Sequence, residues 1–168
     1  KPILWGGKNK YAVVVGISNY QDSAILDIKD ARRDAETFAA WLHSESGGSL
    51  PLENVVLLTD AQATLSRVGN AINEMSLASG SSDGLILYFV GYGGGLQQVE
   101  AQPEFFYFFD TPAEVMRAGS YPMHLHFANL VKRKKNPYLV VSNLYHRESR
   151  AELSQVDFSE YRAATKPY

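Results

Sequence analysis

Four continuous apolar runs divide the chain and predict four β-strands. They occupy residues 11–16, 54–59, 84–90 and 138–142. Their apolar residues are partly β-branched and do not alternate with polar ones. Strands of a parallel sheet have this pattern, because other elements cover both of their faces. We therefore expect four parallel strands that are buried on both sides.

Stretches with apolar residues at every third or fourth position lie between these runs and predict helices. The first helix is expected over residues 27–43, and the second over residues 65–77 with Thr64 as its N-cap. A third is expected from Pro122 to the basic cluster at 132–135, which suits the negative end of a helix dipole. This order of elements predicts the α/β class, as a three-layer α/β/α fold with a mostly parallel sheet.

Three segments fit neither pattern. Residues 105–109 are all aromatic and predict a short buried strand or hairpin, with an exposed docking surface as the alternative. Residues 1–9 are interpreted as a leader segment, and residues 149–168 as an irregular polar tail. The fourth strand is expected at a sheet edge, which needs protection from uncontrolled pairing. We expect the tail to cover that edge, or a second copy of the chain to pair there.

Composition limits the classes of function. The 168 residues predict a single domain, and the absence of cysteine excludes disulfides, thiolate metal sites and thiol nucleophiles. The net charge of −2 provides no general attraction to nucleic acid, although the cluster at 132–135 leaves a nucleic-acid patch as an alternative. No apolar stretch approaches the roughly 18 residues of a membrane span. We expect no nucleic acid, no membrane-spanning segment and no cofactor, and favour the cytoplasm.

The ends of the third and fourth runs contain the residues most relevant to function. The third run continues into Gly91-Tyr92-Gly93-Gly94, and the fourth into Asn143-Leu144-Tyr145. Functional groups of open α/β sheets gather beyond the carboxyl ends of the strands. Neighbouring strands lie about 4.8 Å apart. If the two strands are neighbours, Tyr92 and Tyr145 lie close together on one rim of the sheet.

Five segments in the same order resemble the motifs of the caspase-like fold, in particular those of metacaspases and their bacterial relatives, the orthocaspases. They are residues 11–20, 29–31, 58–60, 89–94 and 143–148. The resemblance extends from about residue 10 to residue 148 and implies a single large-subunit (p20-type) domain. The second, p10-type half of the family is absent or not included.

The resemblance also implies the role of individual positions. The general base of the family falls on Tyr92 and its cysteine nucleophile on Tyr145. Two acids form the basic-residue pocket of the family. One falls on Asp30 and is retained, whereas the other falls on Asn143, which has no charge. The frame of a peptidase site is therefore expected without its two reactive groups.

Tyrosine is a poor replacement for either member of such a dyad. An unperturbed phenol has a pKa near 10, so about one in a thousand is ionised at pH 7. It is therefore a poor base and a poor nucleophile. The amides around Gly93 and Tyr145 could still bind a carbonyl. We expect an inactive pseudopeptidase that acts as a binding, regulatory or scaffold domain, with an active relative, another protein or a second copy as partner.

Other interpretations stay open. A hydrolase could use Ser142 or Ser149 with His146, or Tyr145 as a substitute nucleophile, although no Gly-x-Ser-x-Gly elbow is present. A small-ligand sensor could use the rim at Tyr92, although the glycine run lacks the lysine of a P-loop.

Two structural interpretations are equally simple. The two phenols could merely fill a vacated cleft, and Asp30 could support the dipole of its helix. His124 and His126 lie two positions apart without an obvious carboxylate partner, so no metal site is expected.

Overall fold

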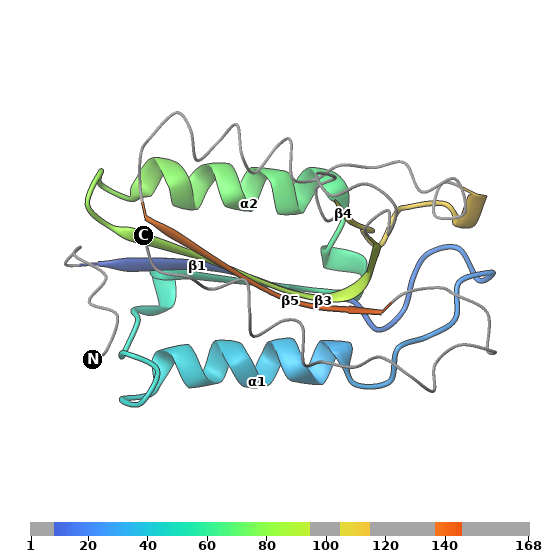
Figure 1. The fold of residues 1–168 in the computed structure, drawn as a ribbon, viewed down its shortest axis with the longest axis horizontal. Coiled ribbons are helices and arrows are strands. Elements are labelled where there is room, and N and C mark those ends of the chain that lie inside the picture. Colours follow the sequence, from blue (N-terminus) through green and yellow to red (C-terminus); the bar gives the residue numbers. More distant parts are fainter. Residues whose placement is uncertain (1–8, 95–104, 115–136, 146–168) are drawn as a thin grey trace, which may run out of the picture.

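The computed structural model describes residues 9–94, 105–114 and 137–145. All four expected strands form in this part of the chain, as β1 (Lys10–Gly16), β2 (Val55–Thr59), β3 (Gly84–Gly94) and β5 (Tyr138–Tyr145). They pair in parallel in the order β2-β1-β3-β5. A two-residue strand, β4 (Phe105–Phe106), pairs antiparallel with the end of β3. The fold is α/β, as predicted, with a parallel main sheet (Figure 1).

Two described α-helices connect these strands, α1 (Ala31–His43) and α2 (Leu65–Ala78), and they lie on opposite sides of the sheet (Figure 1). Short 3-10 turns, η1 (Leu52–Asn54) and η2 (Asp60–Gln62), flank β2. The hydroxyl of Thr64 accepts a hydrogen bond from the amide of Arg67 at 3.3 Å, which confirms the predicted N-cap of α2. The expected helix from Pro122 to residue 135 lies outside the described residues.

Helix α1 begins at Ala31, four residues later than predicted. The preceding residues form a loop in which the amide of Ile28 donates to the carbonyl of Ser18 at 2.8 Å. Ile28 is buried, so its apolar character marks the core rather than a helical turn. The Ser18 hydroxyl then accepts from the amide of Arg32 at 3.0 Å and satisfies one free donor of the first turn.

Alternate residues of the central strands enter two separate apolar clusters. The cluster that includes α2 contains Val13, Val15, Leu85, Leu87, Phe89, Val68 and Ile72. The cluster that includes α1 contains Ala12, Val14, Ile86, Ala35, Ala39 and Leu42. This division follows from the strand period of two, which directs successive side chains to opposite faces. Strands β1 and β3 are therefore buried on both faces, as their continuous apolar runs predict.

Gly16, at the end of β1, permits the close approach of α1. A Cβ atom at Gly16 would lie 2.4 Å from Ala35 Cβ and 2.5 Å from the Ala31 carbonyl oxygen. Both distances are shorter than any ordinary contact, so a side chain here would push the helix away from the sheet. The start of α1 is thus held at the carboxyl end of β1.

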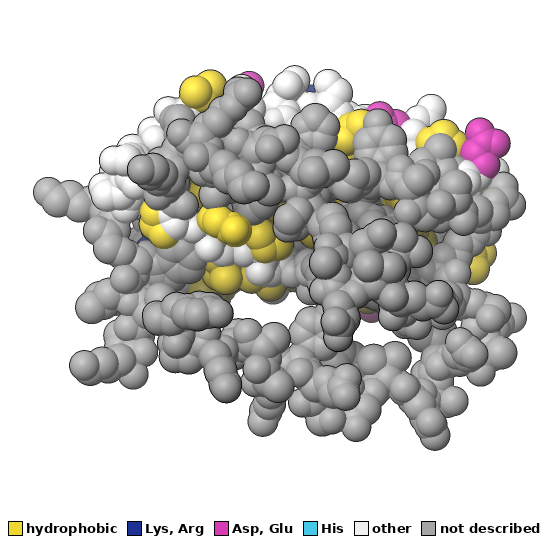
Figure 2. All heavy atoms as spheres, turned by 45° about the horizontal axis from the view of Figure 1, so that its top comes forward, with side chains coloured by type: hydrophobic (Ala, Val, Ile, Leu, Met, Phe, Trp, Pro, Cys, Tyr) yellow, Lys and Arg dark blue, Asp and Glu magenta, His cyan; other side chains and the backbone are white. Residues whose placement is uncertain are grey.

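The prediction of burial on both faces is wrong for β5. Leu139 is 40% exposed and Val140 is 37% exposed, and these two residues lie on opposite faces. The cause is position, because β5 follows β3 at the end of the strand order and α1 and α2 pack mainly on β1, β2 and β3. Figure 2, turned toward the side that carries α2, shows hydrophobic side chains of described residues at the surface.

The aromatic segment is part of the core. Phe106, Tyr107 and Phe108 are buried, and the Phe106 ring lies 4.3 Å from that of Phe89 on β3. This confirms the expected buried strand and contradicts the alternative of an exposed docking surface for these three side chains. Residues 1–8 of the leader segment and the tail at 149–168 lie outside the described residues. Within the described ranges, no helix has both the length and the apolar character needed to cross a membrane.

Candidate rim at the ends of β3 and β5

Tyr92 and Tyr145 are register partners on the neighbouring parallel strands β3 and β5. They form the last pair of the β3–β5 ladder, at the carboxyl ends of both strands. The first turn of α1 lies at the same end of the sheet (Figure 1). The sequence-based expectation that the two tyrosines share one rim therefore agrees with the register. We call this end of the sheet, with Tyr92, Asn143 and Tyr145, the tyrosine rim.

Strand alternation assigns the residues of the tyrosine rim to the face of the sheet that carries α1, although Tyr92, at the end of β3, packs with Tyr20 against the cluster that includes α2. Tyr88, four residues before Tyr92, stacks on Phe38 of α1 with ring centroids 4.1 Å apart and planes 13° apart. Strand alternation places Tyr92 on the same face as Tyr88, and register partners share a face. Tyr145 and Asn143, the partners of Tyr92 and Val90, therefore face the same side.

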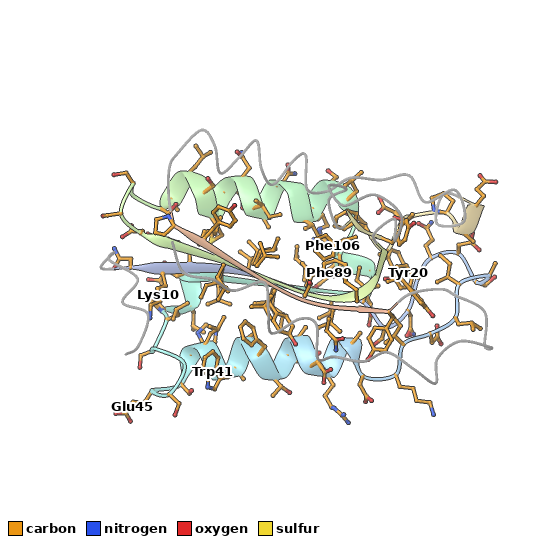
Figure 3. All side chains as sticks on the ribbon, in the orientation of Figure 1. Lys10, Tyr20, Trp41, Glu45, Phe89 and Phe106 are labelled. Atoms are coloured by element: carbon orange, nitrogen blue, oxygen red, sulfur yellow. The ribbon has the colours of Figure 1, made fainter. Side chains whose placement is uncertain are left out.

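Tyr20, in the loop after β1, contacts Tyr92 through both its ring and its hydroxyl. The two ring centroids lie 5.5 Å apart at an angle of 49°. The amide of Tyr92 donates to the Tyr20 hydroxyl oxygen at 2.8 Å, and that hydroxyl donates to the Tyr107 carbonyl at 3.5 Å. Burial raises the pKa of Tyr20 well above its ordinary value, so the phenol stays protonated. Figure 3 shows Tyr20 at the end of the sheet opposite to Lys10.

The amide of Gly93 points toward β5. Successive residues of a strand direct their backbone groups to opposite edges, and Tyr92 directs its amide to Tyr20 and its carbonyl to the amide of Tyr107. The register then places the Gly93 amide beside the carbonyl of Tyr145, where a regular parallel ladder forms a hydrogen bond. A ligand carbonyl at Gly93 would have to compete with this ladder.

The phenol of Tyr145 is accessible at the surface. Its residue is 37% exposed, whereas Tyr92 is half-buried against the core. Burial raises the pKa of Tyr88, and the nearby Asp34 carboxylate and Tyr145 add to the shift. Asp34 and Tyr145 are therefore both close enough to Tyr88 to influence its charge. This part of the rim offers hydroxyl and carboxylate groups on an aromatic surface.

The two pocket positions implied by the resemblance have different surroundings. Asp30 stands at the N-cap position of α1 but makes no side-chain cap. Its carboxylate instead pairs with Arg33 at 2.9 Å, with half of the Asp30 side chain exposed. Asn143 is exposed on β5. Asn143 lies two residues before Tyr145 on the same face of β5, whereas Asp30 lies at the start of α1 in a surface ion pair.

Sequence reasoning missed Asp60 and Tyr20, which organise this end of the sheet. Asp60 follows β2 with a φ of +43°, a left-handed conformation that is unusual for a residue other than glycine. Its Oδ1 accepts from the amides of Ser18 and Asn19 at 2.8 and 3.1 Å. The sequence did contain a signal for Asp60. Ser18 and Asn19 follow the first predicted strand and Asp60 follows the second, and neighbouring parallel strands end at the same edge of the sheet.

The described side chains of the tyrosine rim, those of Tyr92, Asn143 and Tyr145, carry two phenols and an amide. Within the described ranges, no three histidine, aspartate or glutamate side chains form a group that could hold a metal ion. His124, His126, His146 and Ser149 lie outside the described residues. Ser142 is exposed on the face of β5 opposite to Tyr145, because successive strand residues alternate.

Comparison with known proteins identifies the fold but no function. Neither a protein-family model nor a curated protein sequence matches the chain. A crystal structure of a Geobacter sulfurreducens protein, a structural genomics target, matches with a TM-score of 0.61 and 22% sequence identity. The match covers 84% of this chain and 52% of that one, so this chain spans about half the length of its structural neighbour. At this identity the likeness shows the α/β fold alone.

Proposed function

We propose that this protein is a catalytically inactive caspase-like homologue of the metacaspase type, which acts by binding a protein partner at the tyrosine rim. The observation that carries the proposal is the pairing of Tyr92 with Tyr145 at the carboxyl ends of β3 and β5. The resemblance places a base and a nucleophile at these two positions. Here both are phenols, and the chain contains no cysteine.

The surroundings of the two phenols support binding without turnover. An active dyad needs a nucleophile that a neighbouring base activates. Tyr92 is instead packed against Tyr20, and its amide is hydrogen-bonded to the Tyr20 hydroxyl. Tyr145 is exposed on the same face. Aromatic residues with a polar tip are enriched in the central contacts of protein interfaces.

The rival nucleophile Ser142 has less support from the geometry. It lies on the face of β5 opposite to Tyr92 and Tyr145, so it does not share their rim. A phenol nucleophile at Tyr145 would require an activating group. Among the described residues, Tyr88 interacts with Tyr145, and it is itself a phenol rather than an imidazole.

Selection from a library of displayed random peptides tests the binding proposal. Enriched peptides are titrated by fluorescence anisotropy against the unmodified protein and the double variant Tyr92→Ala with Tyr145→Ala. Central interface residues cost about 2 kcal/mol or more when truncated, so we expect at least about a 30-fold loss of affinity.

The matched control for this experiment is Tyr138→Ala. Tyr138 lies at the opposite end of β5 and is 52% exposed. This variant should keep its affinity, and thermal unfolding checks that all proteins are folded. Equal binding by the double variant, or no enrichment over a blank surface, would contradict binding at the rim.

A further inference from the structure

The end of β1 leaves a gap in the hydrogen bonding of β3. Even-numbered residues of β3 direct their backbone groups toward β1, as the bond from the Ile17 amide to the Val90 carbonyl at 3.0 Å shows. The last register pair of β1 and β3 is Gly16 with Val90. The next amide directed to that side belongs to Tyr92, and β1 does not extend far enough to accept from it.

We infer that Tyr20 is the positioning residue of the tyrosine rim. Its hydroxyl accepts the hydrogen bond that a carbonyl of a longer β1 would accept from the Tyr92 amide, and this bond holds Tyr92 beside Tyr145. The inference rests on the proposed function for the use of the rim, but its geometry stands by itself. The Tyr92 amide donates to Tyr20 at 2.8 Å, and the Tyr92 carbonyl accepts from Tyr107 at 2.9 Å. Tyr20 and the β4 segment thus continue the sheet beyond β1.

Gly91 provides the space for this hydroxyl. A Cβ atom at Gly91 would lie 2.9 Å from the Tyr20 hydroxyl oxygen and 3.1 Å from a ring carbon of Phe89. The contact with Phe89 alone is tight but allows a small shift, whereas the hydroxyl oxygen is held by two hydrogen bonds. Gly91 and Tyr20 therefore depend on each other.

The loop that carries Tyr20 is anchored on both sides of the phenol. Before it, Asp60 accepts from the amides of Ser18 and Asn19. After it, the amide of Gln21 donates to the Phe109 carbonyl at 2.9 Å, and the Asp22 carboxylate accepts from the amide of Ala113 at 2.8 Å. The position of the hydroxyl is therefore set by the surrounding fold and does not depend on a ligand.

A preformed rim is the consequence for binding. Tyr20 is 7% exposed and contacts Tyr92 through ring and hydroxyl together, which restricts both the backbone and the side chain of Tyr92. A partner then meets an ordered Tyr92, and less freedom is lost on association. Tyr20 itself is too deeply buried to take part in the contact.

The variant Tyr20→Phe tests the inference, since it removes one oxygen atom and keeps the ring. Amide hydrogen exchange is measured by NMR in the variant, in the unmodified protein and in the control variant Tyr11→Phe, which changes a half-buried phenol of β1. In Tyr20→Phe we expect the exchange rate of the Tyr92 amide to rise at least about tenfold more than the exchange rates of the Leu87 and Phe89 amides. Uniform acceleration along β3, or none at Tyr92, would overturn the positioning role.

A double-variant cycle with Gly91→Ala provides the second test. In the unmodified protein the new methyl group meets the Tyr20 hydroxyl, whereas in the Tyr20→Phe background that oxygen is absent. We expect Gly91→Ala to accelerate exchange at Tyr92 several-fold less in the Tyr20→Phe background. Strictly additive effects would show that Gly91 and Tyr20 act independently and would contradict the inference.

A measurement on the unmodified protein covers the case in which a variant fails to fold. Tyr92 lies beyond the end of β1, yet its amide should exchange as slowly as that of Phe89. Fast exchange would overturn the inference. None of these measurements needs a partner, so they can succeed even if peptide binding at the rim fails, and the two proposals stay distinguishable.

Discussion

Tyr92 and Tyr145 are register partners on parallel strands, so their side chains leave the sheet on the same face. Tyr92 is packed against Tyr20, whereas Tyr145 is exposed. Tyr92 is therefore held in place by the scaffold, whereas Tyr145 is the more accessible of the two phenols. This division suits a recognition surface better than a reacting pair, in which both groups must reach the substrate.

The contact between Gly16 and α1 predicts a large cost for a single methyl group. Gly16→Ala places a Cβ 2.4 Å from Ala35 Cβ, and overpacking of this kind costs about 1–3 kcal/mol. Gly69→Ala is the matched control, because a Cβ at this helical position meets nothing within 4 Å. It should stabilise the protein by up to about 1 kcal/mol through helix propensity. Urea unfolding measures both, and equal effects would contradict the packing described for α1.

The Asp60 carboxylate predicts different outcomes for two substitutions. Asp60→Ala removes the acceptor for the amides of Ser18 and Asn19, and the alanine must still adopt the left-handed backbone conformation of Asp60. We therefore expect the unfolding free energy to fall by about 2–3 kcal/mol. Asp60→Asn retains an oxygen acceptor and tolerates the positive φ, so its cost should be smaller. Chemical denaturation distinguishes them. A milder effect for alanine than for asparagine would show that the carboxylate does not anchor the loop.

Burial of phenols predicts a loss of stability in alkaline solution. The pKa of Tyr20 and that of Tyr107 are raised from the ordinary value of 10.0, mainly by burial. Below pH 10 these phenols are protonated in both states, and above it the unfolded chain releases protons first. The unfolding free energy should therefore fall above pH 10, by up to about 1.4 kcal/mol per pH unit for Tyr20 and by less for Tyr107.

Tyr20→Phe provides the control for this alkaline effect. It removes one titrating group, so its stability should decline less steeply above pH 10 than that of the unmodified protein. Urea unfolding between pH 8 and pH 11 gives both curves. Parallel curves would mean that Tyr20 titrates alike in the folded and unfolded states, contrary to its burial.

The aromatic segment of β4 predicts a core defect. Phe106 is buried, and its ring centroid lies 4.3 Å from that of Phe89. Phe106→Ala should therefore lower the unfolding free energy by about 3–5 kcal/mol. Leu52→Ala is the control, because Leu52 is 77% exposed and should change stability by less than about 0.5 kcal/mol. Thermal and urea unfolding provide the comparison. A mild effect at Phe106 would place this segment at the periphery instead of the core.

The strands could be predicted closely from the sequence because their apolar runs are continuous. The first run was expected from Tyr11 and the strand begins at Lys10, and the second was expected from Asn54 and the strand begins at Val55. Strand β3 is longer than its apolar run, since glycines at its end still pair with β4 and β5. Such pairing depends on partners distant in the sequence, which local patterns do not contain.

The rim was predicted in part. The tyrosines at the ends of two apolar runs indicated its position, because parallel strands end at one edge. Tyr20 and Asp60 lie in segments that resemble family motifs, but their roles were missed, since each acts through a contact between loops that no spacing rule describes. The exposure of Leu139 and Val140 was also missed, because an apolar run gives no information about the place of a strand in the sheet.

The most direct test of the central claim, binding without turnover, is a hydrolysis assay. The purified protein is incubated with fluorogenic peptides that end in arginine or lysine, with and without calcium, beside the variants Tyr92→Phe and Tyr145→Phe. We predict no release of fluorophore above the buffer control in any sample. Hydrolysis that persists through purification and disappears in Tyr145→Phe would contradict the account and establish an enzyme.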